Sequence, residues 1–231
     1  MSEIQTQIIS SSPTNVAQAQ KKVVVSFETR GRRRPYYVNG NRYDRYFALV
    51  PARSDAELII NHVIDSVKDK VLRDVRIVDG STIIFLPSVP LHVERIKKDG
   101  TRNFRFALPA DVGRQIAGKE IFVYAYVGEG DNSVLRLDSR TYNAVAVFET
   151  TFVYNGSIIA SVPVKFSDLI PVEPDRKLEV DVVSNDAIKT VYAVPYYNGY
   201  YKDKPRIALR FEKNDVIDLL GKKAVLVVKV Q

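Results

Sequence analysis

The chain has 231 residues, of which 45% are apolar, enough for one large or two small domains with real cores. It has no cysteine, which excludes disulfides and thiolate chemistry, and its two histidines exclude a histidine-rich metal site within one chain. The net charge of +7 is focused, because residues 21–53 hold nine basic and two acidic side chains whereas residues 128–231 hold 14 of each.

Signals for a cellular compartment are few. No run of about 18 uncharged apolar residues occurs, so we expect no transmembrane helix and no membrane partner. Residues 1–20 lack the basic and apolar regions of a signal peptide and are predicted to form a disordered polar arm. The absence of cysteine, a single methionine and many Val, Ile, Tyr, Lys and Arg residues are typical of a cytoplasmic protein from a hot environment.

The first predicted elements form a hairpin. A strand runs from Val23 to about Glu28, and the chain continues through an arginine-rich segment to Asn39-Gly40, the dipeptide most typical of a type I′ turn. Alternating residues 43–48 form the returning strand, which Pro51 ends.

A short helix is predicted next, capped by Ser54 or Asp55. Leu58, Ile59, His62 and Val63 follow helical spacing, so His62 is interpreted as a packed or boundary residue. The following strand covers Val75–Val78 and ends at the turn Asp79-Gly80.

The same order then repeats. Strand segments Thr82–Leu86 and Leu91–Ile96 are expected to be interrupted at Pro87 and Pro90, and Lys98-Asp99-Gly100 is a hairpin turn. The segment Phe104–Val127 then supplies a strand, a short helix and a second strand.

This segment recurs 103 residues later as Ile207–Val230 without a gap. In each copy three alternating residues are predicted to point inward, and a glycine follows the helix where a left-handed C-cap is needed. The inward residues are Phe104, Phe106 and Leu108, then Ile207, Leu209 and Phe211; the helical apolar pairs are Val112 with Ile116 and Val216 with Leu220, and the glycines are Gly118 and Gly221.

Predicted turns at 39–40, 99–100, 155–156 and 198–199 mark four units of roughly fifty residues: strand, turn, strand, short helix, strand. One unit cannot bury both faces of its hairpin, so pairs should interlock. We therefore predict a mainly β protein with short helices, built as two tandem small β-barrels. The predicted parts are the arm 1–20, a basic barrel 21–127, a linker 128–132 and a second barrel 133–231. An open β-sandwich or jelly roll with added helices is the alternative.

The segment Ala107–Val112, followed by Gly118-Lys119-Glu120 and an apolar strand, resembles the swapped-hairpin unit of AbrB-like proteins. Residues 162–170 and 174–180 look similar. Cradle-loop barrels share this strand–helix–strand logic. The resemblance covers about 25 residues per unit. It implies a DNA-binding protein, but the longer, differently charged hairpins prevent transfer of individual DNA contacts.

The most suggestive candidate site is the first hairpin, where arginines alternate with tyrosines. Guanidinium groups bind phosphate in bidentate fashion, tyrosines stack on bases, and a two-stranded ribbon fits a DNA major groove. The alternative is a solvated arginine-rich loop with tyrosines on the strand surface, or a protein partner. The candidate nucleic-acid-binding residues are Arg30, Arg32, Arg33, Arg34, Tyr36, Tyr37, Arg42, Tyr43 and Arg45.

Two further clusters are weaker candidates. Tyr196, Tyr197, Tyr200 and Tyr201, beside Lys202, Lys204 and Arg206, are a second stacking surface, an oligomer contact or ordinary strand residues. Lys97, Lys98 and Arg102 flank a turn, where charges commonly serve solubility alone.

The sequence thus favours a cytoplasmic nucleic-acid-binding protein, with DNA as the preferred partner. It indicates no catalytic residues, no metal site and no cofactor, although an enzyme of small molecules or nucleotides stays an open reading. The runner-up is a structural or assembly protein, such as a viral capsid or turret component located in the virion, which self-associates through its tyrosine-rich hairpins.

Overall fold

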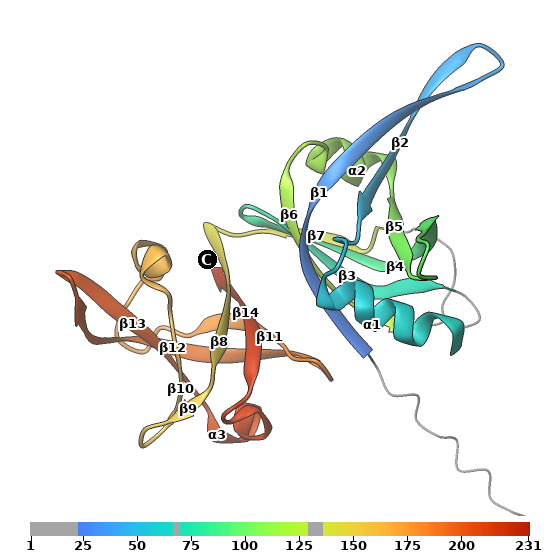
Figure 1. Ribbon diagram of the computed structural model, residues 1–231. Helices are drawn as coiled ribbons and strands as arrows, with labels where there is room; N and C mark the ends of the chain where they lie inside the picture. Colours follow the sequence, from blue (N-terminus) through green and yellow to red (C-terminus); the bar gives the residue numbers. More distant parts are fainter. Residues whose placement is uncertain (1–22, 67–69, 129–135) are drawn as a thin grey trace, which may run out of the picture.

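The computed structural model describes residues 23–66, 70–128 and 136–231, which fold mainly into β-strands with a few short helices (Figure 1). The strands form two sheets, and each sheet curls around a core of its own. The predicted fold class, mainly β with two barrel-like units, is therefore confirmed. The predicted arm and residues 129–132 of the predicted linker lie outside the described residues.

In the first half, six strands close a ring. The elements are β1 (Val23–Val38), β2 (Asn41–Leu49), α1 (Asp55–Val63), η1 (Ile64–Ser66), β3 (Val71–Asp79), β4 (Thr82–Ile96), β5 (Arg102–Leu108), α2 (Ala110–Ile116) and β6 (Glu120–Gly128). Neighbouring strands pair in the order β3–β6–β1–β2–β5–β4, and β4 returns to β3. The long strand β1 makes closure possible, since residues 23–30 pair with β6 and residues 31–38 pair with β2.

The second half follows the same path. Its elements are β7 (Asp138–Thr141), β8 (Ala144–Thr151), β9 (Val153–Tyr154), β10 (Ile158–Ser161), η2 (Val164–Leu169), β11 (Leu178–Val183), β12 (Ile188–Tyr201), β13 (Lys204–Phe211), α3 (Lys213–Val216), η3 (Ile217–Leu219) and β14 (Lys223–Val230). The pairing order β8–β14–β11–β12–β13–β10–β9 matches the order β1–β6–β3–β4–β5–β2 followed by a return to β1. Only Phe152 separates β8 from β9, so together they correspond to the single strand β1.

The predicted inward residues of both repeat copies are buried, as are Val112 and Ile116, and Gly118 and Gly221 have the expected positive φ values. One detail of the second copy was wrong, because Leu219 is buried and Leu220 is 39% exposed. After Val216 the helix tightens into η3, whose three residues per turn bring position i+3 rather than i+4 back to the core.

The helix α1 also differs from the prediction. Ser54 caps it as expected, accepting a hydrogen bond from the Glu57 amide at 3.2 Å. However, its buried face contains Ala56 and Ile60, and His62 is exposed. The interpretation of His62 as a packed or boundary residue, which rested on its helical spacing from Leu58, was therefore wrong.

Two further predictions, a strand interruption and a hairpin turn, were also wrong. The strand β4 runs through Pro87 and Pro90 without interruption, and its partner changes from β3 to β5 just after Pro90, a position where a residue without an N–H is tolerated. The Asn198-Gly199 pair forms an irregularity within β12 rather than a turn. The hairpin instead turns at Lys202-Asp203, where both φ values are positive.

A third apolar cluster joins the two halves. Tyr124 on β6 packs there with Val183 and Val227 of the second sheet, and its hydroxyl reaches Asp181. The short strand β7 was not predicted, and although it follows the linker it pairs with β4 at the edge of the first sheet. None of the described helices has the length and apolar character needed to cross a membrane.

Candidate nucleic-acid interface

The hairpin β1–β2 extends well beyond the first barrel as a two-stranded ribbon (Figure 1). Asn39 and Gly40 at its tip have φ values of 49° and 78°, which confirms the predicted type I′ turn. From Arg32 to Arg45 every residue is exposed except Tyr36 and Asp44, which are half-buried. The ribbon therefore offers its side chains to a partner on both faces.

The strand register sorts the predicted residues into two faces, because side chains directly opposite each other in an antiparallel ladder share a face. The outer face continues the exterior of the barrel, and the core-side face continues the side that carries the buried Tyr46. Outer-face residues are Arg32, Arg34, Tyr36, Tyr43 and Arg45; core-side residues are Arg33, Tyr37, Asp44 and Arg42.

The tyrosines of the two faces have different surroundings. The rings of Tyr36 and Tyr43 are 5.5 Å apart at an interplanar angle of 31°, and the Arg45 guanidinium carbon lies 4.3 Å from the Tyr36 ring centroid. Tyr36 is thus covered by its neighbours and stiffens the ribbon. Tyr37 is 69% exposed, so its ring is the one most open to a base.

The arginines differ in their ion pairing. Arg30 donates from Nε to the Gly118 carbonyl oxygen at 2.9 Å and lies 3.3 Å from Glu120, at the foot of the ribbon. Arg33 lies 3.7 Å from Asp44. Within the described residues, Arg32, Arg34, Arg42 and Arg45 have no carboxylate partner, but Arg45 lies over the Tyr36 ring, which leaves the other three. These three cations are the ones available to an anion.

A groove of about 390 Å³ lies where β2 leaves the barrel, beside the end of β5 and the start of α2. It is lined by Asp44, Arg45, Tyr46, Phe47, His92, Arg105, Ala107, Leu108 and Ala110. Neither Arg105 nor His92 was among the site residues predicted from the sequence. The alternation of β5 could indicate that Arg105 points outward, but only the pairing of β2 with β5 brings it to the hairpin.

The groove holds side chains of both signs, namely Arg45, Arg105 and Asp44. Arg105 is paired with Glu94 at 3.0 Å, and its guanidinium carbon lies 5.9 Å from the Phe47 ring centroid. Partial burial, and then the positive charge of Arg105, lower the pKa of His92 and favour its neutral form. The groove thus combines an aromatic ring with two arginines at the foot of the ribbon.

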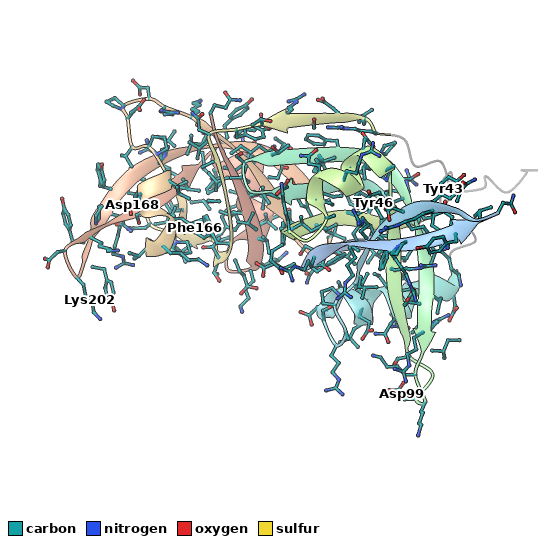
Figure 2. All side chains as sticks on the ribbon, turned by 90° about the horizontal axis from the view of Figure 1, so that it is seen from above. Tyr43, Tyr46, Asp99, Phe166, Asp168 and Lys202 are labelled. Carbon is teal, nitrogen blue, oxygen red and sulfur yellow. The ribbon has the colours of Figure 1, made fainter. Side chains whose placement is uncertain are left out.

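The other two predicted clusters lie elsewhere. Tyr197, Tyr200 and Tyr201 are each more than half exposed on β12, but Lys202 at that hairpin tip and Tyr43 lie at opposite ends of the molecule (Figure 2). Lys97 binds the buried Glu57 at 3.0 Å and Arg102 makes a bidentate pair with Asp65, so both serve structural contacts.

In the part of the chain that the structure describes, no three His, Asp or Glu side chains gather as a metal site would require. Comparison of the chain with protein families, with curated proteins and with solved structures gives no match. The arrangement of side chains therefore carries the functional argument alone.

Proposed function

We propose that this protein binds nucleic acid, with DNA preferred, through the β1–β2 ribbon. The observation that carries the proposal is the set of three exposed arginines, Arg32, Arg34 and Arg42, which lack carboxylate partners among the described residues of a ribbon that extends beyond its barrel. An arginine without an intramolecular partner is free to bind a phosphate in bidentate fashion.

The remaining residues divide into supporting and contacting roles. Arg45 and Tyr36 hold each other in place, and Arg30 and Arg33 fix the foot of the ribbon through Glu120 and Asp44. Tyr37 and the half-exposed Tyr43 offer ring surface to bases. A ribbon of this width fits the major groove of B-DNA, whereas the major groove of double-stranded RNA is too narrow. The resemblance of Ala107–Val112 and Gly118-Lys119-Glu120 to AbrB-like proteins also favours DNA.

The direct test is the binding of labelled duplex and single-stranded DNA by fluorescence anisotropy over a series of salt concentrations. We expect an affinity that falls steeply as salt rises, because each phosphate contact releases bound counterions. Absence of binding at low salt would refute the proposal.

The second candidate is an assembly protein, including a virion component, and the exposed tyrosines of the β12–β13 hairpin favour it. Tyrosine is enriched at protein interfaces, and Tyr197, Tyr200 and Tyr201 cluster at one tip. Sedimentation velocity distinguishes the candidates: a large closed assembly without DNA binding supports this one, and a small DNA-binding species supports the first.

A further inference from the structure

The second barrel has a groove at the place that corresponds to the groove beside the ribbon. It has a volume of about 380 Å³ and is lined by Tyr154, Gly156, Ser157, Ile158, Lys177, Tyr192, Val194, Arg210, Phe211, Glu212 and Lys213. In the first barrel Tyr46 pairs with Leu108, and in the second Ile158 pairs with Phe211. The 103-residue repeat places Phe211 at the position of Leu108, so the two grooves are equivalent by register.

The repeat also shows how the two grooves differ. Arg210 stands at the position of Ala107, and Lys213 stands at the position of Ala110. The second groove therefore receives its positive charge from β13, from α3 and from Lys177 just before β11, whereas the first contains Arg45 and Arg105. Both grooves therefore contain basic side chains, but different positions supply them.

The net charge of residues 128–231 is zero and so does not reveal the basic side chains that line this groove. Many cations of that half are neutralised in ion pairs, among them Arg140 with Asp138, Lys189 with Asp218 and Lys223 with Glu149. By contrast, Lys177, Arg210 and Lys213 are exposed and have no carboxylate partner in the described ranges of the chain. The residues that line the groove thus include these three cations and one carboxylate, Glu212, so the groove favours an anionic ligand.

Two tyrosine rings complete the groove. Tyr154 on β9 is 62% exposed and Tyr192 on β12 is 55% exposed, and both residues line the groove. Exposed aromatic rings combined with unpaired basic side chains form a typical surface for single-stranded nucleic acid, in which bases stack and phosphates are neutralised. A duplex keeps its bases stacked and cannot insert one into such a groove.

We propose that this groove is a second nucleic-acid site, one that binds an unpaired base and its flanking phosphates. Lys177, Arg210 and Lys213 contact the phosphates, and Tyr154 and Tyr192 stack on the base. The proposal goes beyond the ribbon and does not depend on it, because every residue of this site belongs to the second barrel.

The experiment measures anisotropy of a labelled oligothymidine over a salt series for the full chain and two triple variants. The groove variant carries Lys177→Gln, Arg210→Gln and Lys213→Gln, and the control carries Arg140→Gln, Lys189→Gln and Lys223→Gln, which remove the same charge from ion-paired positions. We expect the groove variant to lower the salt slope by about 2, at about 0.7 per phosphate contact, and the control to leave the slope unchanged. Equal effects of the two variants would overturn the proposal.

A second variant separates stacking from charge. Tyr192→Leu is expected to weaken oligothymidine binding about ten-fold without a change in salt slope, and to leave duplex binding unchanged. Unchanged oligothymidine affinity would contradict the stacking role. If replacing Arg32, Arg34 and Arg42 abolishes binding while the groove variant behaves as wild type, the ribbon proposal stands and this one fails. If only the groove variant lowers the oligothymidine salt slope, and replacing Arg32, Arg34 and Arg42 changes duplex binding no more than the control does, this proposal stands and the ribbon proposal fails.

Discussion

The Tyr124 hydroxyl donates a hydrogen bond to the Asp181 carboxylate at 2.5 Å, from the first barrel to the second. Both side chains are fully buried. Asp181 also accepts from the Thr190 hydroxyl at 2.7 Å and the Lys229 ammonium at 2.8 Å, and Lys229 reaches Glu179 as well. A buried carboxylate with three donors is well satisfied, and this network fixes how the two halves of the chain meet.

We predict that Tyr124→Phe lowers the free energy of unfolding by about 1–3 kcal/mol, because it removes a donor from a buried carboxylate without a change of shape. Urea denaturation of the purified protein measures the loss. Tyr192→Phe, at an exposed ring on β12, is the matched control and should change stability by less than about 0.5 kcal/mol. Equal stability of the two variants would contradict a structural role for the Tyr124–Asp181 hydrogen bond.

Lys229→Met should be more costly, about 3–5 kcal/mol, because it leaves the Asp181 charge buried without its cation. The methionine keeps most of the side-chain volume, so the loss reports charge rather than a cavity. Lys223→Met, on the same strand but exposed in a surface ion pair with Glu149, is the control and should have little effect. A loss below about 1 kcal/mol for Lys229→Met would show that Asp181 is satisfied without it.

Stability should decline at alkaline pH through the same network. Burial, and then the Asp181 carboxylate, raise the pKa of Tyr124 well above its usual value. In the unfolded chain a tyrosine ionises at about pH 10, whereas Tyr124 in the folded protein stays protonated at that pH. The contribution of Tyr124 to the free energy of unfolding is therefore intact below about pH 10 and is lost progressively as the pH rises above it. Tyr124→Phe should remove about 1.4 kcal/mol per pH unit from this decline. Denaturation midpoints at pH 8 to 11 measure the slope, and an identical slope in the variant would contradict the prediction.

The foot of the ribbon depends on a close approach of β1 to α2. A Cβ atom at Gly31 would lie 2.2 Å from the Ile116 carbonyl oxygen, so Gly31→Ala must move one backbone away from the other. We predict a loss of about 1–3 kcal/mol in stability. At Gly128 a Cβ atom would meet only the Arg73 side chain at 3.6 Å, so Gly128→Ala should be tolerated. Thermal denaturation compares the two, and equal melting temperatures would refute the close contact.

Local patterns predicted much of this protein because they depend on neighbours in sequence. The Asn39-Gly40 turn follows from two residues that accept positive φ, and the inward residues of β5 and β13 follow from strand alternation. The pattern was insufficient at Asn198-Gly199, since the same dipeptide fits an irregularity in β12 and the turn formed four residues later.

The sequence predicted which segment forms the candidate site, but not which of its arginines lack a carboxylate partner. The partner of Arg30 is Glu120, on a strand ninety residues away, and that pairing depends on the barrel topology. The groove beside the ribbon likewise required the pairing of β2 with β5. The corresponding groove of the second barrel lies in a half whose net charge is zero, so composition gave no signal for it.

The two tyrosines at neighbouring positions of β1 should respond differently to substitution. Introduced into the groove variant with Lys177, Arg210 and Lys213 changed to glutamine, Tyr37→Ala is predicted to weaken the remaining single-stranded DNA binding about ten-fold, because it removes the most exposed ring of the ribbon. Tyr36→Phe keeps the ring beneath Arg45 and should leave binding unchanged. Anisotropy titrations at one salt concentration compare them, and a larger effect at Tyr36 would reverse the assigned roles.

The most direct test of the ribbon proposal is the salt dependence of duplex DNA affinity, measured for the wild type and two triple variants. The ribbon variant has Arg32, Arg34 and Arg42 changed to glutamine. The control variant has Arg140, Lys189 and Lys223 changed to glutamine. Both variants lose the same charge, but only the first loses cations without carboxylate partners among the described residues. We predict that the slope of log affinity against log salt falls by about 2 to 3 in the ribbon variant, and that the control keeps the wild-type slope. Equal slopes in the two variants would contradict phosphate binding by the ribbon.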